Sequence, residues 1–148
     1  MSPGPQTATA SSALPSLGPL EQKVQEILWR SDAPLSARQV MHLLPSGEGA
    51  TPAYTTVATV LDHLQSKGLA RRARLGRSWS YEPALTGCEY SARRMAQSLA
   101  ETPDPVRCLA RFVGMLTPEH HRTLTGLLDG SIAVPPPRAR TGLDDLTG

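Results

Sequence analysis

The chain has few cysteines, few aromatic side chains and no long apolar run, and each shortage excludes a class of protein. Two cysteines among 148 residues are too few for a disulfide framework. No run of about 18 apolar residues occurs, so we expect no membrane-spanning helix. The segment 1–19 has no basic cluster followed by an apolar core, so it lacks the pattern of a secretory signal. These observations favour a protein of the reducing cytoplasm.

The motifs of common enzyme classes are also missing. The chain has no glycine-rich phosphate loop, no HExxH motif and no GxSxG motif, so the sequence predicts neither an enzyme nor a cofactor. Cys88 and Cys108 fall on predicted apolar helices, which favours buried structural thiols. His120 and His121 are adjacent, and neighbouring side chains point about 100° apart on a helix, so they chelate a metal poorly.

Positive charge is concentrated in one short segment. Residues 67–77 include five basic residues and no acidic one, whereas the formal net charge of the whole chain is only +2. A basic strip on a nearly neutral body is typical of a protein that binds a phosphate backbone, although a charge run alone also fits a solvated turn. The five residues are Lys67, Arg71, Arg72, Arg74 and Arg77.

Helical periodicity followed by strand periodicity marks residues 19–84 as one domain. Apolar spacing predicts helices from Pro19 to about Arg30, from the capping-box sequence Ser36–Gln39 to about Leu44, and from about Ala53 to Lys67. Polar and aromatic residues then alternate, which predicts a hairpin that turns at Gly76. This order is that of a winged helix-turn-helix domain. The expected buried residues are Leu20, Val24, Ile27, Leu28, Val40, Leu43, Leu44, Tyr54, Val57, Val60, Leu61, Leu64, Trp79 and Tyr81.

A second set of helices is predicted over residues 85–129. Apolar stripes and capping residues indicate helices from Thr86 to about Ala100, over about 106–116, and from Thr117 to 129. Residues 1–18 and 130–148 are rich in proline and small residues without periodicity, so we expect both ends to be disordered. The predicted fold class is mostly α with a small β wing.

The third predicted helix carries short polar side chains opposite its apolar side. In a helix-turn-helix the second helix of the pair lies in the major groove. Threonine offers a hydroxyl for a phosphate or base and a methyl for the thymine methyl group, although each of these residues alone also fits plain surface. The groove-facing candidates are Thr55, Thr56, Thr59 and His63; the phosphate candidates are Arg38, Lys67, Arg71, Arg72, Arg74 and Arg77.

Several stretches together resemble the penicillinase-repressor family. This family comprises the winged-helix repressors of β-lactamase and methicillin resistance, with copper-responsive repressors as relatives. The resemblance extends from residue 17 to about residue 129 and is most specific in the third predicted helix and the hairpin. The stretches are LGPLEQKVQEILWR (17–30), PLSARQV (34–40), AYTTVATVLDHLQSKGLARR (53–72) and GRSWSYEPA (76–84).

The resemblance implies a cytoplasmic homodimer that represses transcription by binding an inverted repeat in double-stranded DNA. The wings would flank the DNA, and the segment 85–129 would form a helical dimerisation module. Many members of the family respond to a membrane metalloprotease sensor that cleaves the repressor. The implied dimer interface consists of Tyr90, Met95, Leu99, Leu109, Phe112, Val113, Leu116, Leu124, Leu127 and Leu128.

Two features depart from the family pattern. The best-known β-lactam repressors are cut at an Asn–Phe bond, but Arg111 precedes Phe112 here and the chain contains no asparagine. The copper branch carries paired cysteines, and this chain has no Cys-x-Cys sequence. A metal-responsive regulator and a winged-helix module that binds proteins without specific DNA binding remain as alternatives.

Overall fold

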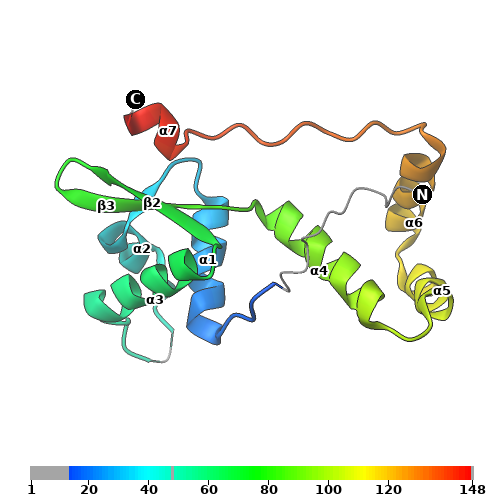
Figure 1. The fold of residues 1–148 in the computed structure, drawn as a ribbon, viewed down its shortest axis with the longest axis horizontal. Helices are drawn as coiled ribbons and strands as arrows, with labels where there is room; N and C mark the ends of the chain where they lie inside the picture. The colour runs from blue at the N-terminus through cyan, green and yellow to red at the C-terminus, as the bar shows by residue number, and fades with distance from the viewer. Residues whose placement is uncertain (1–13, 48, 148) are drawn as a thin grey trace, which may run out of the picture. The chain divides into compact units, whose positions relative to one another are not determined.

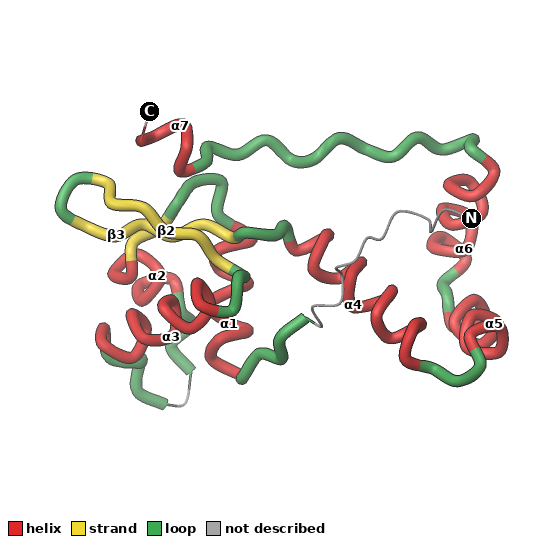
Figure 2. Tube along the Cα trace, in the orientation of Figure 1, coloured by secondary structure: helices red, strands yellow, loops and turns green. Residues whose placement is uncertain are grey.

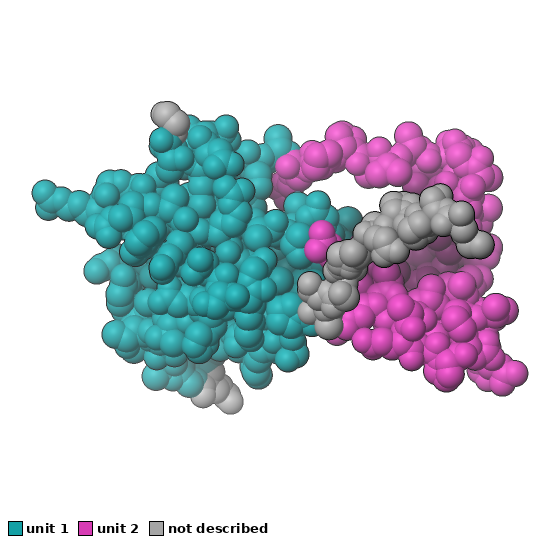
Figure 3. Space-filling model, viewed as in Figure 1, with its two compact units in different colours: residues 1–91, 139–148 teal, residues 92–138 magenta. Residues whose placement is uncertain are grey.

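The computed structural model describes residues 14–47 and 49–147, which form two compact units (Figure 3). Unit 1 comprises the described residues up to Ser91 together with those from Ala139 onward, and unit 2 comprises Ala92–Arg138. No helix in the described part of the chain is long and apolar enough to cross a membrane. The elements, drawn in Figures 1 and 2, are α1 (Pro19–Arg30), β1 (Leu35–Ser36), α2 (Ala37–Leu43), α3 (Tyr54–Ser66), β2 (Ala70–Leu75), β3 (Ser78–Pro83), α4 (Gly87–Glu101), α5 (Pro105–Met115), α6 (Pro118–Asp129) and α7 (Leu143–Thr147).

Unit 1 has three helices followed by a β-hairpin, as the sequence predicts. Its antiparallel sheet has the strand order β1-β3-β2, and the hairpin pairs Arg72 with Tyr81 and Ala73 with Ser80. Gly76 at the hairpin turn has a φ of 66°, a left-handed conformation that glycine adopts without steric cost. The mostly helical chain with its small sheet confirms the predicted winged helix-turn-helix class.

The first strand of the sheet was not predicted. It contains only Leu35 and Ser36, which pair with Tyr81 and Ser80 of β3, and two residues are too few to show an alternating pattern. Ser36 then caps α2, because its side chain accepts the Gln39 N–H at 3.2 Å while its own N–H donates to Gln39 Oε1 at 2.8 Å. This reciprocal pair confirms the predicted capping box and fixes the turn from strand to helix.

One face of each of the first three helices forms the core of unit 1. Val24, Val57 and Leu61 are fully buried, as predicted. Leu43 and Tyr54, by contrast, are 57% and 50% exposed, so the prediction that they are buried is wrong. Leu43 lies in the last turn of α2 and Tyr54 in the first turn of α3. The apolar spacing extends to these positions, but the neighbouring elements that cover the rest of each helix do not.

The start of α4 belongs to unit 1. The indole N–H of Trp29 donates to the Leu85 carbonyl oxygen at 2.9 Å, and the rings of Trp29 and Tyr90 lie 5.3 Å apart at an interplanar angle of 46°. Tyr90 is only 5% exposed, so it is a core residue of unit 1 rather than the dimer contact that the sequence suggested. The boundary between the units therefore follows Ser91, whereas we expected it after residue 84.

Both ends of the described chain are more ordered than expected. Leu14 and Leu17 pack against the core, and the rest of the expected N-terminal extension, residues 1–13, lies outside the described residues. Residues from 130 onward were expected to be disordered, but they include α7, whose Leu143 is 2% exposed. Burial of a single apolar side chain such as Leu143 can order a segment whose composition is otherwise typical of disorder. The composition of the segment does not show that the folded domain offers a surface for that side chain.

Tyr81 connects the sheet to α3. The side chain is 4% exposed, and its hydroxyl donates to Asp62 Oδ1 at 3.4 Å. Arg72 donates to the same carboxylate oxygen at 2.7 Å. Burial raises the pKa of the Tyr81 phenol above its ordinary value, so the folded chain favours the neutral phenol.

We expect Tyr81 to make unit 1 less stable in alkaline solution. The unfolded chain releases the phenol proton near the ordinary pKa of 10.0, whereas the folded chain holds it to higher pH. The contribution of Tyr81 to the free energy of unfolding is therefore full at a pH below the pKa of the phenol in the unfolded chain. As pH rises above that pKa, the free energy of unfolding declines by at most about 1.4 kcal/mol per pH unit. Tyr81→Phe should flatten the decline in urea midpoint between about pH 9 and about pH 11. Tyr54→Phe, at an exposed tyrosine, is the matched control, and an equal decline in wild type and Tyr81→Phe would contradict the assignment.

Candidate nucleic-acid interface

One side of α3 is polar and exposed. The buried side chains Val57, Val60, Leu61 and Leu64 occupy the other side of the helix. The Thr59 hydroxyl donates to the Thr55 carbonyl oxygen at 2.8 Å, so its proton is used within the helix, which leaves its methyl group and an accepting oxygen for a partner. The structure places all four predicted groove-facing residues on this exposed side: Thr55, Thr56, Thr59 and His63.

The beginning of α3 has no side-chain cap. Ala53 occupies the N-cap position and makes no side-chain hydrogen bond to the first turn. The uncapped N–H groups and the positive end of the helix dipole favour a negatively charged partner at this end. Tyr54, in the same turn, is half exposed, and Arg38 is exposed on α2.

The indole of Trp79 lies against two arginines of β2. The guanidinium carbons of Arg72 and Arg74 stand 4.5 and 5.4 Å from its ring centroid. Trp79 is 40% exposed, so the expectation that it belongs to the core is wrong. It pairs with Arg74 near the free end of the hairpin, where arginines rather than helices cover it. These cation–π contacts hold both guanidinium groups on one face of the wing.

Three of the predicted phosphate contacts are paired with carboxylates. Arg72 reaches Asp62 of α3 at 2.7 Å, which ties the wing to the exposed helix. Such pairs orient side chains but contribute little stability where they are exposed to solvent, about 1 kcal/mol or less. The pairs are Lys67 with Glu21, Arg71 with Glu82 and Asp144, and Arg72 with Asp62.

The other three predicted phosphate contacts have no such partner. In the described ranges 14–47 and 49–147, Arg38, Arg74 and Arg77 have no carboxylate within ion-pair distance. Arg74 donates to the Arg77 carbonyl oxygen at 3.2 Å, which holds its guanidinium group at the hairpin turn. Arg74 and Arg77 therefore place two uncompensated positive charges at the end of the wing.

Sequence reasoning missed the acidic partners because they are remote in the chain. Lys67 and Glu21 are 46 residues apart, and Arg71 and Asp144 are 73 residues apart. Two signals were closer in the chain: Asp62 precedes the basic run, and Glu82 stands opposite Arg71 in the hairpin that the sequence predicts. A carboxylate close to a basic run is positioned to pair with one of its cations.

The described residues form no candidate metal site. Among the residues that are described, no three His, Cys, Asp or Glu side chains cluster in a way that could hold an ion. Cys88 and Cys108 are free thiols, the first exposed and the second half-buried. The expectation that both thiols are buried is wrong, because Cys88 occupies the exposed side of α4 and the helices of unit 2 bury few side chains.

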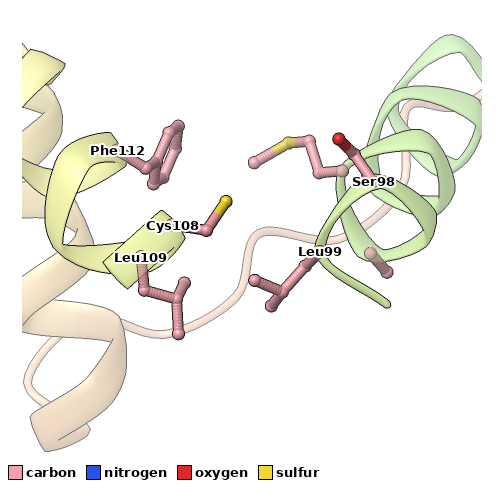
Figure 4. Close-up of a pocket in the computed structure, with 7 residues that line it drawn as sticks. Ser98, Leu99, Cys108, Leu109 and Phe112 are labelled. Atoms are coloured by element: carbon pink, nitrogen blue, oxygen red, sulfur yellow. The ribbon is translucent and has the colours of Figure 1, made fainter. Parts of the chain in front are cut away.

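Unit 2 leaves most of its apolar side chains uncovered. No residue of α5 is buried, and Leu109, Phe112 and Val113 are between 37% and 46% exposed. An apolar cavity of about 320 Å³ separates α4 from α5 and is lined by Leu99, Leu109 and Phe112, among others (Figure 4). An apolar surface of this kind in a small helical unit is typical of a protein interface.

The other predicted dimer residues are distributed over the same helices. Met95 of α4 lines the cavity and is 57% exposed, and α6 contributes two further exposed leucines. Apart from Tyr90, the whole predicted set therefore belongs to unit 2. The remaining exposed members are Leu127 and Leu128, and the half-buried members are Leu99, Leu116 and Leu124.

Comparison with known proteins agrees with this geometry. The chain is 38% identical over 88 residues to the transcriptional regulator BlaI of Mycobacterium tuberculosis, in both strain CDC 1551 and strain H37Rv. The aligned part is 60% of this chain and spans 62% of the length of those relatives. Residues 17–130 match the model of the family described as penicillinase repressor, a family of transcriptional repressors and not of enzymes. The chain belongs to the penicillinase repressor family.

Proposed function

We propose that the chain is a homodimeric repressor that binds an inverted-repeat operator in double-stranded DNA. The observation that carries the proposal is the exposed threonine face of α3 beside the uncompensated arginines of the wing, Arg74 and Arg77. In this arrangement α3 enters the major groove, and Arg38, Arg74 and Arg77 bind phosphates on either side. The DNA target places the working protein in the cytoplasm.

Small side chains on α3 give close contact but few hydrogen bonds. Thr59 presents a methyl group, and the uncharged residues Thr55 and Thr56 allow the helix backbone to approach the bases. Base discrimination by such contacts is modest, about 1–3 kcal/mol at each position. Affinity must therefore come from phosphate contacts and from the coupling of two half-sites.

The apolar surface of unit 2 supports the dimer. We infer that α5 and α6 pack against the same helices of a second copy, which removes Phe112 and Leu109 from water. Once one winged helix is bound, the other meets its half-site at an effective concentration that can reach the millimolar range. An occupied operator then excludes RNA polymerase, so repression needs no chemistry.

We propose that the inducing signal acts on unit 2, because loss of coupling weakens binding without altering α3. Cleavage by a membrane metalloprotease sensor is the family's common route. Here the Arg111–Phe112 bond lies inside α5, so a protease acting on it would first have to unwind that helix. We extend the role of the BlaI relatives, which are transcriptional regulators, to this chain as part of the same proposal.

Replacement of both wing-end arginines should weaken binding to all sequences alike. Each subunit of the dimer loses two phosphate contacts, so four are lost per dimer, and the slope of log K against log salt falls by about 3.6 in magnitude because each contact contributes about 0.9. We would measure Arg74→Ala/Arg77→Ala on mixed-sequence duplex DNA by fluorescence anisotropy across a salt series. Arg122→Ala, an exposed arginine of unit 2, is the control and should leave the slope unchanged. An unaltered slope in the double variant would remove the wing from the interface.

Thr59 should specify sequence through its methyl group. Since its hydroxyl already donates to Thr55, Thr59→Val should retain the base preference, whereas Thr59→Ser and Thr59→Ala should both relax it at one position of each half-site, by about 1–3 kcal/mol. The measurement is selection of bound sites from a random duplex pool, followed by affinities for single-base variants. A serine variant that behaves as wild type, with a valine variant that does not, would assign the contact to the hydroxyl.

Phe112→Asp should convert the dimer into monomers. A charge in the apolar surface of α5 is left unpaired in a dimer but solvated in a monomer. Sedimentation velocity should give a species near 15.8 kDa for the variant and near twice that mass for the wild type. Leu43→Asp, at a leucine of unit 1 that is more exposed than Phe112, should remain dimeric. If Phe112→Asp also sediments as a dimer, the α5 surface is not the interface.

A further inference from the structure

The outer face of the hairpin is covered by the end of the chain. Strand side chains alternate, so Arg72 and Tyr81 face α3 while their neighbours Arg71, Ser80 and Glu82 face the other way. Ser80 and Glu82 are nonetheless only 7% and 6% exposed. The element that reaches Glu82 is α7, which contacts β2 and β3 and which Figure 1 shows next to β2.

Glu82 is the centre of this contact. One of its carboxylate oxygens, Oε2, accepts the Leu143 N–H at 2.9 Å, and the other, Oε1, lies 3.5 Å from Arg71 Nη1. A buried carboxylate is costly unless such partners satisfy it. The Leu143 side chain is itself 2% exposed, so one backbone hydrogen bond and one apolar side chain are fixed at the same point of the sheet.

Ion pairs and backbone hydrogen bonds also hold the residues on both sides of Leu143. Arg71 Nη2 donates to both carboxylate oxygens of Asp144, at 3.1 and 3.2 Å. The Thr141 N–H donates to the Asp32 carbonyl oxygen at 2.8 Å. Asp145 accepts the Gly142 N–H at 2.9 Å, which keeps the segment in the turn that presents Leu143. The bound segment is therefore an acidic peptide with one buried leucine.

We propose that the outer face of the β2–β3 hairpin is a binding site for an acidic peptide, filled by residues 141–147 of the same chain, and that the bound segment withholds Arg71 from DNA. This inference rests on the proposed DNA-binding function. Arg71 belongs to the basic run of the wing, but Glu82 and Asp144 together place two negative charges against it. When the segment leaves, Asp144 leaves with it and Arg71 gains the freedom to reach a phosphate.

The linker permits this exchange. Residues 131–139 of the connection from α6 are exposed and include three consecutive prolines, so the segment can detach without disturbing α6. Its attachment depends on few contacts, and a segment held in this way opens more readily than the core. A phosphate and the Asp144 carboxylate offer Arg71 the same paired-oxygen geometry, so the two compete for one guanidinium group.

The test compares two aspartate substitutions in α7 of the full-length chain. Leu143→Asp places a charge at the buried position, and Leu146→Asp adds the same charge at a side chain that is 48% exposed. We expect Leu143→Asp, but not Leu146→Asp, to lose amide exchange protection at Thr141 and Leu143. Thermal unfolding checks that unit 1 stays folded in both variants, and Asp144→Asn removes the ion pair while leaving Leu143 in place.

Salt dependence of binding to mixed-sequence duplex DNA gives the second measurement. Relative to Leu146→Asp, both Leu143→Asp and Asp144→Asn should steepen the slope by about 1.8, the value for one phosphate contact in each subunit of the dimer. Arg71→Gln should abolish that difference. Unchanged exchange protection in Leu143→Asp overturns the peptide site, and equal slopes overturn the competition for Arg71. If Leu143→Asp, Asp144→Asn and Leu146→Asp give equal slopes while Arg74→Ala/Arg77→Ala still lowers the slope, only this inference fails. If the protein binds no duplex DNA at all, the proposed function fails as well.

Discussion

The rotation of α3 about its own axis is fixed by the side chains that it buries. Val57, Leu61 and Leu64 have no exposed surface, and they leave the helix only one way to sit on the core. That orientation turns Thr55 and Thr59 outward. A shift by one residue would rotate the helix by about 100° and bury polar groups in place of leucines. The surface offered to a partner is thus decided by packing on the opposite side of the helix.

The same orientation decides which charges of the wing are free. Asp62 points toward the sheet and holds Arg72, and Arg72 in turn lies over Trp79. The wing is therefore joined to α3 through Asp62, which pairs with Arg72, while the Trp79 ring steadies Arg72 within the wing, so the two elements form one surface. Compensation by carboxylates leaves Arg74 and Arg77 as the free cations at the hairpin end. A count of basic residues along the sequence overstates the charge available for phosphates.

Sequence reasoning succeeded where the determining interactions are local. The helix stripes, the Ser36–Gln39 capping box and the Gly76 turn all depend on residues within a few positions of one another, and all are present. It failed where the partner is remote. Trp29 bonds to Leu85 across 56 residues and draws Tyr90 into the core, and Leu143 bonds to Glu82 across 61. Periodicity places Tyr90 on a predicted helix but gives no sign that Leu143 is ordered, and only the tertiary contacts show what buries each of them.

On the proposed function, affinity and specificity have separate origins in this chain. Short side chains on α3 contribute little binding free energy each, so they select among sequences but cannot hold the protein on DNA. Retention depends on phosphate contacts from unit 1 and on the pairing of two copies through unit 2. A signal that loosens unit 2 then releases the operator without changing the sequence preferred by α3. Detachment of α7 from the hairpin instead alters the number of phosphate contacts. A signal at unit 2 and detachment of α7 therefore change the affinity for DNA independently, and neither changes the exposed threonine face of α3.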